Sequence, residues 1–271
     1  MQDKKYDIVL AIAGSDSGGG AGIQADIKTI SACGCYAATA ITAVTVQNTL
    51  GVVAVEAITP QTLAAQIDAV LSDIGADAIK IGMLHSSETI IHVKAELEKA
   101  SIRNIVLDPV MVATSGHRLI EESAIETLKT ELIPMARVIT PNIPEAEILL
   151  GKSISEQAQM GVAARELAEM YNVSVLLKAG HLNEDRLVDY LYDLESETLL
   201  PLESKRLNTN NTHGTGCTLS SALASFLARG FSLPESATRA KKYIEQAIIA
   251  GAEYKIGNGH GPVKHFWELW R

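Results

Sequence analysis

Short β-rich runs alternate with helical stretches along almost the whole chain, and this alternation constrains the fold more than any other feature. The first run, Tyr6–Ala13, precedes a glycine-rich loop, and Ile23, Ile27 and Ile30 then recur at helical spacing within Ala21–Ser31. Repeated strand–helix units favour a mostly parallel sheet with helices packed on both faces. The sequence therefore predicts an α/β fold with a central sheet between two helical layers.

The rest of the chain continues the same alternation. We expect further strands at Ala38–Val46, Val52–Ile58, Ala78–Gly82, Asn104–Leu107, Arg137–Thr140 and Val173–Lys178, and an antiparallel pair at Leu187–Leu191 and Thr198–Leu202. We expect further helices at Gln61–Ser72, Glu88–Lys99, Ala124–Leu132, Glu145–Leu150, Glu156–Tyr171, Thr215–Ala228 and Glu235–Tyr254. No repeat, low-complexity tract or linker divides these elements, so residues 1–271 are expected to form a single domain.

Charge and composition exclude several classes of partner. The chain has 23 Lys+Arg against 32 Asp+Glu, a formal net charge of −9, and therefore no broad attraction for nucleic acid or anionic membranes. The uncharged stretch between Thr29 and Val55 contains Gln47, Asn48 and several threonines, which suits buried strands better than a membrane span. Three cysteines form no disulfide framework, and the apolar run after Lys5 is too short for a signal peptide. We expect a cytoplasmic protein with no nucleic-acid or membrane partner.

Glycines crowd the segment between the first strand and the first helix, which reads Gly14-Ser-Asp-Ser-Gly-Gly-Gly-Ala-Gly22. The dinucleotide-binding pattern fits formally, but the acidic residue that it needs about 20 residues later is missing, and Ile27 replaces the second glycine of a P-loop. Two interpretations stay open: a tight turn before a helix, or a backbone that a ligand approaches closely. Asp26 on the following helix either suits the helix dipole or receives a substrate hydroxyl.

Ligands of open α/β sheets bind beyond the carboxyl ends of the strands, so residues directly after each strand are candidates. Gln47 can both donate and accept hydrogen bonds, which suits the edge of a heterocycle, although a turn residue is an equal alternative. A lone Met83 after another strand is more typical of the core than of a ligand wall.

Oxygen donors follow two further strands. Asp108 comes after Asn104–Leu107, where it could hold a Mg²⁺-bound water or cap a turn. Asn142 and Glu145 lie between the next strand and its helix, where the helix dipole alone would also favour Glu145. Two or three oxygen ligands from neighbouring strand ends suit Mg²⁺, which keeps much of its water.

The strongest local signal is Thr212-His-Gly-Thr-Gly-Cys-Thr218, directly before a helix with Leu219, Leu223 and Phe226 on one face. Glycines at a helix N-terminus expose backbone N–H groups together with the positive end of the dipole, which makes an anion site without a lysine. Cys217 in this position would have its thiol pKa lowered by the dipole. The alternative is an inert buried cysteine, and we favour a functional one.

Six motifs occur in a familiar order over nearly the whole chain: Ala13–Asp26, Val46-Gln-Asn-Thr49, Lys80-Ile-Gly-Met-Leu84, Asp108-Pro-Val-Met111, Thr140-Pro-Asn-x-x-Glu145 and His213-Gly-Thr-Gly-Cys-Thr218. With them the sequence closely resembles the hydroxymethylpyrimidine/phosphomethylpyrimidine kinases of thiamine biosynthesis, in the ribokinase-like superfamily. The resemblance implies a single domain with the three-layer α/β/α fold. It also implies ATP-dependent phosphorylation of 4-amino-5-hydroxymethyl-2-methylpyrimidine and then of its monophosphate, giving the diphosphate.

The same resemblance implies a role for each matching residue. Residues expected to line the pyrimidine site are Gly14, Ala21, Asp26, Gln47, Met83 and Val110, with Asp26 and Gln47 taking the polar contacts. The expected anion hole for the transferred phosphoryl group consists of Gly214, Thr215 and Gly216, and Cys217 would be the base for the attacking oxygen. Mg²⁺ would be placed, partly through water, by Asp108, Asn142 and Glu145, and Lys178 would face the ATP phosphates.

Three other functions compete with this one. A pyridoxal/pyridoxine kinase of the same branch would use a similar pocket, since both substrates are flat heterocycles with a hydroxymethyl arm. A pyrimidine-binding protein without activity would not need the glycines and cysteine before the Leu219 helix. A nicotinamide-dependent oxidoreductase lacks its ribose-binding acid. The uncharged second and third strands also offer a surface for a homodimer.

Overall fold

The computed structural model describes residues 4–111, 120–180, 182 and 184–270. Their strands form a nine-stranded sheet in the order β3-β2-β1-β4-β5-β6-β7-β8-β9. The strand bounds are β1 Ile8–Asp16, β2 Tyr36–Asn48, β3 Gly51–Ala57, β4 Ala78–Ile81, β5 Ile105–Leu107, β6 Val138–Ile139, β7 Ser174–Leu177, β8 Arg186–Asp193 and β9 Thr198–Lys205.

The six central strands, β2 to β7 in the sheet, run parallel, and the strands at both edges are antiparallel to their neighbours. The expected pair of late strands is confirmed as the β8–β9 ladder, in which Arg186 is opposite Lys205 and Asp193 opposite Thr198. Because the central strands are parallel, their carboxyl ends meet at one edge of the sheet.

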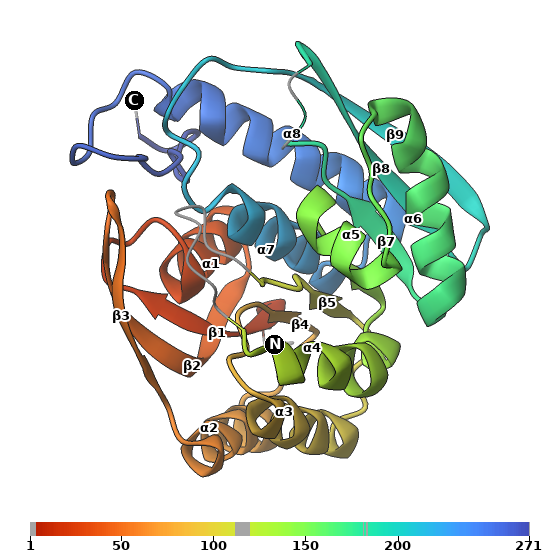
Figure 1. Cartoon of the computed structure of the whole chain (residues 1–271). Coiled ribbons are helices and arrows are strands. Elements are labelled where there is room, and N and C mark those ends of the chain that lie inside the picture. Colours follow the sequence, from red (N-terminus) through yellow and green to blue (C-terminus); the bar gives the residue numbers. More distant parts are fainter. Residues whose placement is uncertain (1–3, 112–119, 181, 183, 271) are drawn as a thin grey trace.

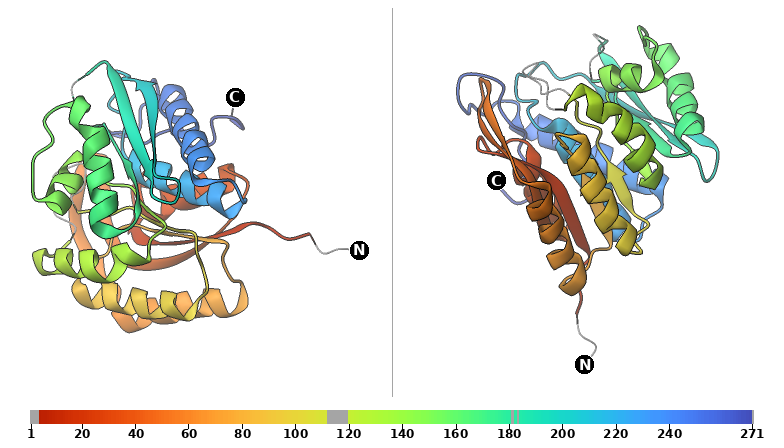
Figure 2. Two further views of the ribbon diagram at one scale, coloured as in Figure 1. Left: turned by 90° about the vertical axis from the view of Figure 1, so that its right-hand side faces the viewer. Right: turned by 60° about the horizontal axis from the view of Figure 1, so that its bottom comes forward.

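Helices cover both faces, which gives three layers (Figure 1). One face carries α2 (Pro60–Asp73), α3 (Ser87–Lys99), α4 (Glu122–Thr127), α5 (Ile143–Leu150) and α6 (Gln157–Tyr171), and the other carries α1 (Gly22–Ala32), α7 (Thr215–Ala228) and α8 (Leu233–Gly251). The helices α2 and α3 lie side by side along their face (Figure 2, right). The expected three-layer α/β/α fold is confirmed, and we propose that residues 1–271 form one domain.

Alternation within the strands explains why two cores form. In β1, Leu10 and Ile12 pack against the α2–α6 layer, whereas Val9 and Ala11 pack against α1, α7 and α8. Strands buried on both faces need apolar residues at every position, and all three residues of β5 are buried. The helix α7 is covered on all sides, since every residue from Thr218 to Leu227 is buried. It is therefore held rigidly at the centre of its layer.

Two local expectations were wrong. β1 continues past Ala13 to Asp16, so the first residues of the glycine-rich segment are strand and not loop. The single helix expected at Ala124–Leu132 is instead the short α4, a π-helical turn at Leu128–Leu132 and a 3₁₀ turn at Ile133–Met135. Pro134 in the last turn has no N–H to donate, which prevents the helix from continuing. No helix in the described part of the chain is long and apolar enough to cross a membrane.

Candidate active site

Six of the predicted site residues lie at or just after the carboxyl ends of the central strands, where the sequence places them. They are Gly14 (β1), Gln47 (β2), Met83 (β4), Asp108 (β5), Asn142 (β6) and Lys178 (β7). The N-terminus of α7 reaches the same edge, because a Cβ atom added at Gly216 would lie 3.3 Å from Lys178 Nζ and 3.5 Å from Asp108 Oδ2. The strand ends and the glycine-rich helix start therefore form one site.

The start of α7 packs directly on the glycine-rich segment after β1. Gly214 is the N-cap residue, with a φ of +78°, and a Cβ atom there would overlap the carbonyl oxygen of Gly20. The same atom would lie 3.2 Å from the Cα of Ala21. Only glycine combines this left-handed backbone with so close an approach. The two glycine-rich segments, about 190 residues apart in sequence, thus build one continuous backbone surface.

The first turn of α7 exposes backbone donors. Gly214 supplies no side-chain cap, and the Thr215 N–H donates to the Thr212 carbonyl at 3.3 Å. The next N–H groups, those of Gly216 and Cys217, have no carbonyl partner one turn earlier within the helix. These donors lie at the positive end of the dipole, next to the Lys178 ammonium. The arrangement suits an anion, as the sequence predicts.

Asp108 and Lys178 form the charged floor of this site. Lys178 Nζ donates to Asp108 Oδ1 at 2.8 Å, and Thr140 Oγ1 donates to the same oxygen at 2.9 Å. Burial would raise the pKa of the Asp108 carboxyl, but Lys178 and Lys80 hold it below its ordinary value. Burial would likewise lower the pKa of Lys178, but Asp108 and Glu145 raise it. Asp108 and Lys178 therefore stay charged at neutral pH.

Asn142 and Glu145 have a structural role at the start of α5, and their role as Mg²⁺ ligands stays a prediction. Asn142 Oδ1 accepts from the Glu145 N–H at 2.9 Å, and Glu145 Oε2 accepts from the Asn142 N–H at 2.8 Å, which is a capping box that starts α5. Burial raises the pKa of Glu145 to about 7, with Asp108 adding to the rise and Lys178 opposing it. A buried carboxyl close to a second carboxylate is a group that a divalent cation would neutralise.

Cys217 lies in the first turn of α7 and is partly exposed. The expectation of a lowered thiol pKa is wrong: burial raises the pKa of Cys217 to about 11, although Lys80 and the backbone N–H of Gly22 act in the opposite direction. The helix dipole acts on the thiolate only against the larger cost of desolvating it. The other two cysteines, Cys33 and Cys35, are buried and unpaired, as predicted.

The residues predicted to line the pyrimidine site divide into three groups. Gly14 and Met83 are in contact, since a Cβ atom at Gly14 would lie 2.5 Å from the Met83 methyl carbon. Gln47 Nε2 lies 3.2 Å from His213 Nε2, beside the start of α7. Val110 is half-buried, and its N–H donates to the Asp108 carbonyl at 2.8 Å. The substrate contacts of all these residues stay predictions.

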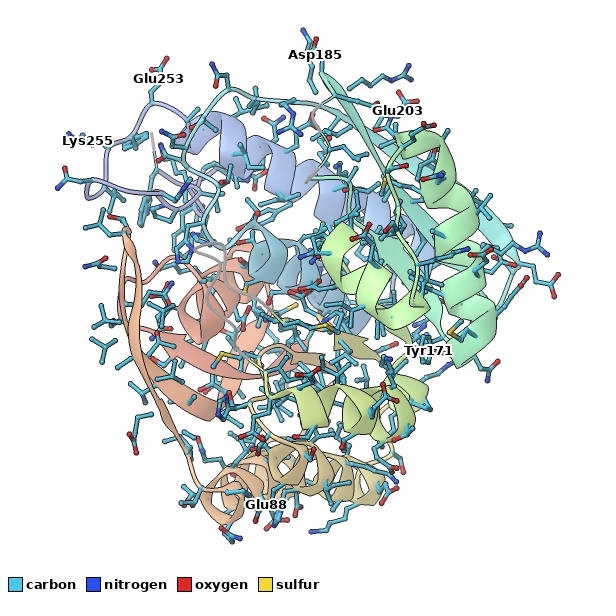
Figure 3. All side chains as sticks on the ribbon, in the orientation of Figure 1. Glu88, Tyr171, Asp185, Glu203, Glu253 and Lys255 are labelled. Carbon is cyan, nitrogen blue, oxygen red and sulfur yellow. The ribbon has the colours of Figure 1, made fainter. Side chains whose placement is uncertain are left out.

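Asp26 is placed differently from its neighbours in the motif. Its side chain is 0% exposed, and Lys80 Nζ lies 2.8 Å and 3.0 Å from its two carboxylate oxygens. Ser221 Oγ of α7 donates to Oδ1 at 2.7 Å. Charged side chains at the rim of the molecule, such as the labelled Glu88 and Lys255 in Figure 3, are exposed instead. Direct contact of Asp26 with a substrate stays a prediction, and its present partners are a buried lysine and a serine.

Sequence reasoning missed Asp16, His213 and Lys80. Asp16 accepts from the N–H groups of Gly18, Gly20 and Ala21 at 2.7–3.0 Å, and its Oδ2 lies 2.9 Å from His213 Nε2. Burial would raise the pKa of Asp16, but the hydrogen bond with His213 and those from the backbone keep it below its ordinary value. The available signal for Lys80 was a single charge within an apolar four-residue strand, which is rare without a buried partner.

A three-layer α/β/α fold with an anion-binding helix start at the carboxyl edge of its sheet defines a phosphotransferase of the ribokinase-like class. Residues 16–264 match the sequence model of a family described as phosphomethylpyrimidine kinase. The chain belongs to this family.

Individual relatives agree with the family assignment. The chain is 47% identical over 265 residues to the hydroxymethylpyrimidine/phosphomethylpyrimidine kinase of Rhizobium meliloti, covering 97% of this chain and 98% of that one. It is 49% identical over 257 residues to the thiamine biosynthesis bifunctional protein ThiED of Geobacter sulfurreducens, covering 95% of this chain and only 52% of that protein. The chain thus spans about half of the bifunctional relative.

Solved structures support the fold. The phosphomethylpyrimidine kinase of Clostridium difficile matches with a TM-score of 0.78 and 43% identity, covering 89% of this chain and 99% of that one. The pyridoxal kinase of Staphylococcus aureus in complex with ADP matches with a TM-score of 0.89 and 33% identity, covering 98% of this chain and 96% of that one.

Proposed function

We propose that this protein is an ATP-dependent kinase that phosphorylates 4-amino-5-hydroxymethyl-2-methylpyrimidine and then its monophosphate, giving the diphosphate for thiamine biosynthesis. The observation that carries the proposal is the start of α7, where Gly216 lies next to the Lys178–Asp108 pair. Phosphoryl transfer depends on positioning and charge neutralisation more than on covalent chemistry by the protein, and this arrangement supplies both. The choice of hydroxymethylpyrimidine and its monophosphate as substrates follows the names of the relatives.

The residues act in two groups. The backbone donor of Gly216 at the start of α7 binds an oxygen of the transferred phosphoryl group, where negative charge accumulates, and Lys178 holds the ATP phosphates. Gly14, Ala21, Met83 and Val110 shape the pyrimidine site, and Gln47 presents a donor and an acceptor to the ring. The attacking oxygen is thereby placed in line with the phosphoryl group, which removes much of the entropic barrier.

Cys217 receives the proton of the attacking hydroxyl in the first step. A thiol with a pKa of about 11 is protonated at neutral pH, so this base works through a small thiolate fraction. The second step starts from a phosphate monoester, whose oxygens are already ionised and need no base. Cys217 is therefore required for the first step much more than for the second.

Mg²⁺ is the metal that fits the oxygen donors near α7. Asp108 and Glu145 are two carboxyl groups at adjacent strand ends, and Asn142 supplies an amide oxygen beside them. These are hard ligands, few in number, as suits a cation that keeps several waters and binds phosphate oxygens. Burial and Asp108 raise the pKa of Glu145 to about 7, and a bound cation would favour its carboxylate form. When bound, Mg²⁺ would neutralise charge on the ATP phosphates.

ADP release from the purified protein with Mg-ATP tests the proposal. We expect turnover with both hydroxymethylpyrimidine and its monophosphate, and little with pyridoxal or pyridoxine. Activity confined to the two B6 compounds would refute the proposed substrate and leave the kinase site intact. Absence of ADP release with all four compounds would refute the kinase function itself.

A B6 kinase is the alternative that a specific observation favours. The pyridoxal kinase of Bacillus subtilis matches with a TM-score of 0.88, higher than the 0.78 of the phosphomethylpyrimidine kinase structure, although its sequence identity is lower, 35% against 43%. Overall shape therefore does not separate the two substrates, whereas the sequence identity is higher to the phosphomethylpyrimidine kinase than to the pyridoxal kinase.

We further propose a homodimer through the β2–β3 hairpin. The edge strand β3 exposes Val53 (75%), and Leu50 in the adjoining turn is also exposed (69%), so an unpaired apolar edge faces solvent. Such edges are normally covered or charged. Sedimentation velocity is expected to show a dimer that Val53→Lys dissociates; a wild-type monomer would contradict this proposal.

A further inference from the structure

A buried ion pair lies close to Cys217, whose thiol is hydrogen-bonded by the N–H of Gly22, one turn before Asp26 on α1. Lys80, the third residue of β4, and Asp26, on α1, are both 0% exposed and joined by contacts of 2.8 and 3.0 Å. The pair is also attached to α7, because Ser221 donates to Asp26 at 2.7 Å and lies one turn after Cys217. One strand and two helices therefore meet at this ion pair.

Stability alone does not account for this pair. Desolvating two charges costs about as much free energy as their attraction returns, and apolar residues of similar volume are often at least as stable. Burial would lower the pKa of Lys80, but Asp26, Cys217 and Asp108 raise it above its ordinary value, so Lys80 remains a cation. A permanent buried cation close to a potential thiolate has an electrostatic consequence for that thiolate.

Four ionisable groups on different elements act electrostatically on Cys217. Lys80 on β4 and Lys178 after β7 are positive, and Asp26 on α1 and Asp108 after β5 are carboxyl groups. Burial raises the pKa of Asp26 above its ordinary value, and the contacts with Lys80 and Ser221 oppose this rise by favouring the carboxylate. Lys178 and Asp108 bond to each other at 2.8 Å and belong to the phosphate side of the site. Lys80 and Asp26 are fully buried and bond to each other.

We propose that Lys80 and Asp26 are positioning residues that set the charge environment of Cys217 with opposite signs, Lys80 favouring the thiolate and Asp26 opposing it. The catalytic use of this effect rests on the proposed function, in which Cys217 accepts a proton. The electrostatic effect itself acts on the free protein without any substrate. For Asp26 this role is separate from the substrate contact predicted from the family resemblance.

The rate at which iodoacetamide alkylates Cys217, measured by peptide mass spectrometry from pH 7 to 10.5 without substrate, tests the proposal. Only the thiolate reacts, so the rate at a fixed pH follows the thiol pKa. Lys80→Met is expected to slow alkylation at pH 9 by roughly tenfold, and Asp26→Asn to accelerate it by roughly threefold to tenfold, since one pKa unit corresponds to tenfold. The double variant should return close to the wild-type rate.

These signs separate the proposal from a purely structural role. If loosened packing were the cause, the alkylation rate of Cys217 would change in the same direction in both single variants. If Asp26 only contacted substrate, Asp26→Asn would leave the alkylation rate unchanged and raise the KM for the pyrimidine. Either result overturns the proposal. Lys94→Met, which removes an ion pair with Glu131 on the outer face of α3, is the control and should leave the rate unchanged. If Lys80→Met does not fold, the double variant, which leaves no unpaired buried charge, can be compared with Asp26→Asn. Asp26→Asn should alkylate faster than the wild type, and adding Lys80→Met to it should slow alkylation again.

Kinase assays on the same variants keep the two proposals distinguishable. We expect turnover of the pyrimidine alcohol to follow the alkylation rate across the variants, with turnover of the monophosphate much less affected. Opposite-sign alkylation changes in a protein without kinase activity would support the electrostatic role and refute the proposed function. Unchanged alkylation rates in variants of an active kinase would refute the electrostatic role and leave the proposed function standing.

Discussion

The backbone of Gly214 faces the carbonyl oxygen of Gly20 so closely that a single methyl group on Gly214 would overlap it. This contact joins the N-terminus of α7 to the glycine-rich segment after β1. It places the proposed phosphoryl-binding donors and the proposed pyrimidine-binding segment on one surface, with their separation fixed by backbone packing.

Gly214→Ala is expected to destabilise the protein by roughly 2–5 kcal/mol and to abolish most phosphoryl transfer, because the new methyl combines a left-handed φ with an overlap. Gly230→Ala is the matched control: its φ is +83°, but its Cβ would meet nothing within 4 Å. The free energy of unfolding of this control variant should fall by only about 1 kcal/mol. Chemical denaturation and ADP release measure both variants, and equal losses would show that the contact with Gly20 is unimportant.

The two phosphorylation steps should depend differently on pH. Because the pKa of Cys217 is about 11, the thiolate fraction rises with each pH unit above neutrality, and the kcat for the alcohol should rise with it. The kcat for the monophosphate should stay nearly flat. Cys217→Ala should lower the kcat for the alcohol by roughly 10²–10⁴-fold and leave ATP affinity nearly unchanged. A normal first step in Cys217→Ala would exclude the thiol as base.

Glu145 should make the folded state less stable as pH rises between about 4.5 and 7. The buried carboxyl has a pKa of about 7 against an ordinary value of 4.5, so in this window the folded chain holds a proton that the unfolded chain has lost. The free energy of unfolding therefore falls by roughly 1–3 kcal/mol as pH rises through the window.

Glu145→Gln removes this dependence and keeps an acceptor for the capping box, so its unfolding free energy should change less with pH. Urea denaturation at pH 5 and pH 8 measures the difference. Added Mg²⁺ should restore stability at pH 8 in the wild type and not in the variant. The same Mg²⁺ response in both would place the cation elsewhere.

Lys178→Met should lower kcat/KM for Mg-ATP by about 10²-fold, because an ammonium next to the anion-binding helix start is lost. The variant also leaves Asp108 buried without its principal cation, which we expect to cost roughly 3–5 kcal/mol of stability. Lys94→Met breaks an ion pair of the same 2.8 Å length on the outside of α3 and serves as control. An unchanged ATP dependence in Lys178→Met would remove Lys178 from the nucleotide site.

The sequence predicted correctly those helices and strands whose ends are set by neighbouring residues. The helix Thr215–Ala228 has the predicted bounds because a glycine precedes it and its apolar stripe is regular. The same holds for the strand ends, since parallel topology alone brings Asp108, Asn142 and Lys178 together. The interrupted helix near Pro134 was missed because periodicity continues through a π-helical turn.

The charges within the site could not be derived locally. Lys80 and Asp26 are 54 residues apart, and nothing near either residue identifies its partner. The thiol pKa of Cys217 was predicted in the wrong direction because the helix dipole can be inferred from the sequence, whereas the depth of burial and the nearby Asp26 and Asp108 cannot. The role of Asp16 could not be predicted because its carboxylate is bonded by three backbone N–H groups and by His213, which is distant in the sequence.

That single Asp16 carboxylate ties the segment expected to hold the ring to the segment expected to hold the phosphate. A substrate with a longer arm between its ring and its hydroxyl would need the two segments to separate, and every such displacement would stretch hydrogen bonds to the same two oxygens. Asp16 therefore fixes the distance between the two segments, and with it the length of the arm between ring and hydroxyl that the site would accommodate.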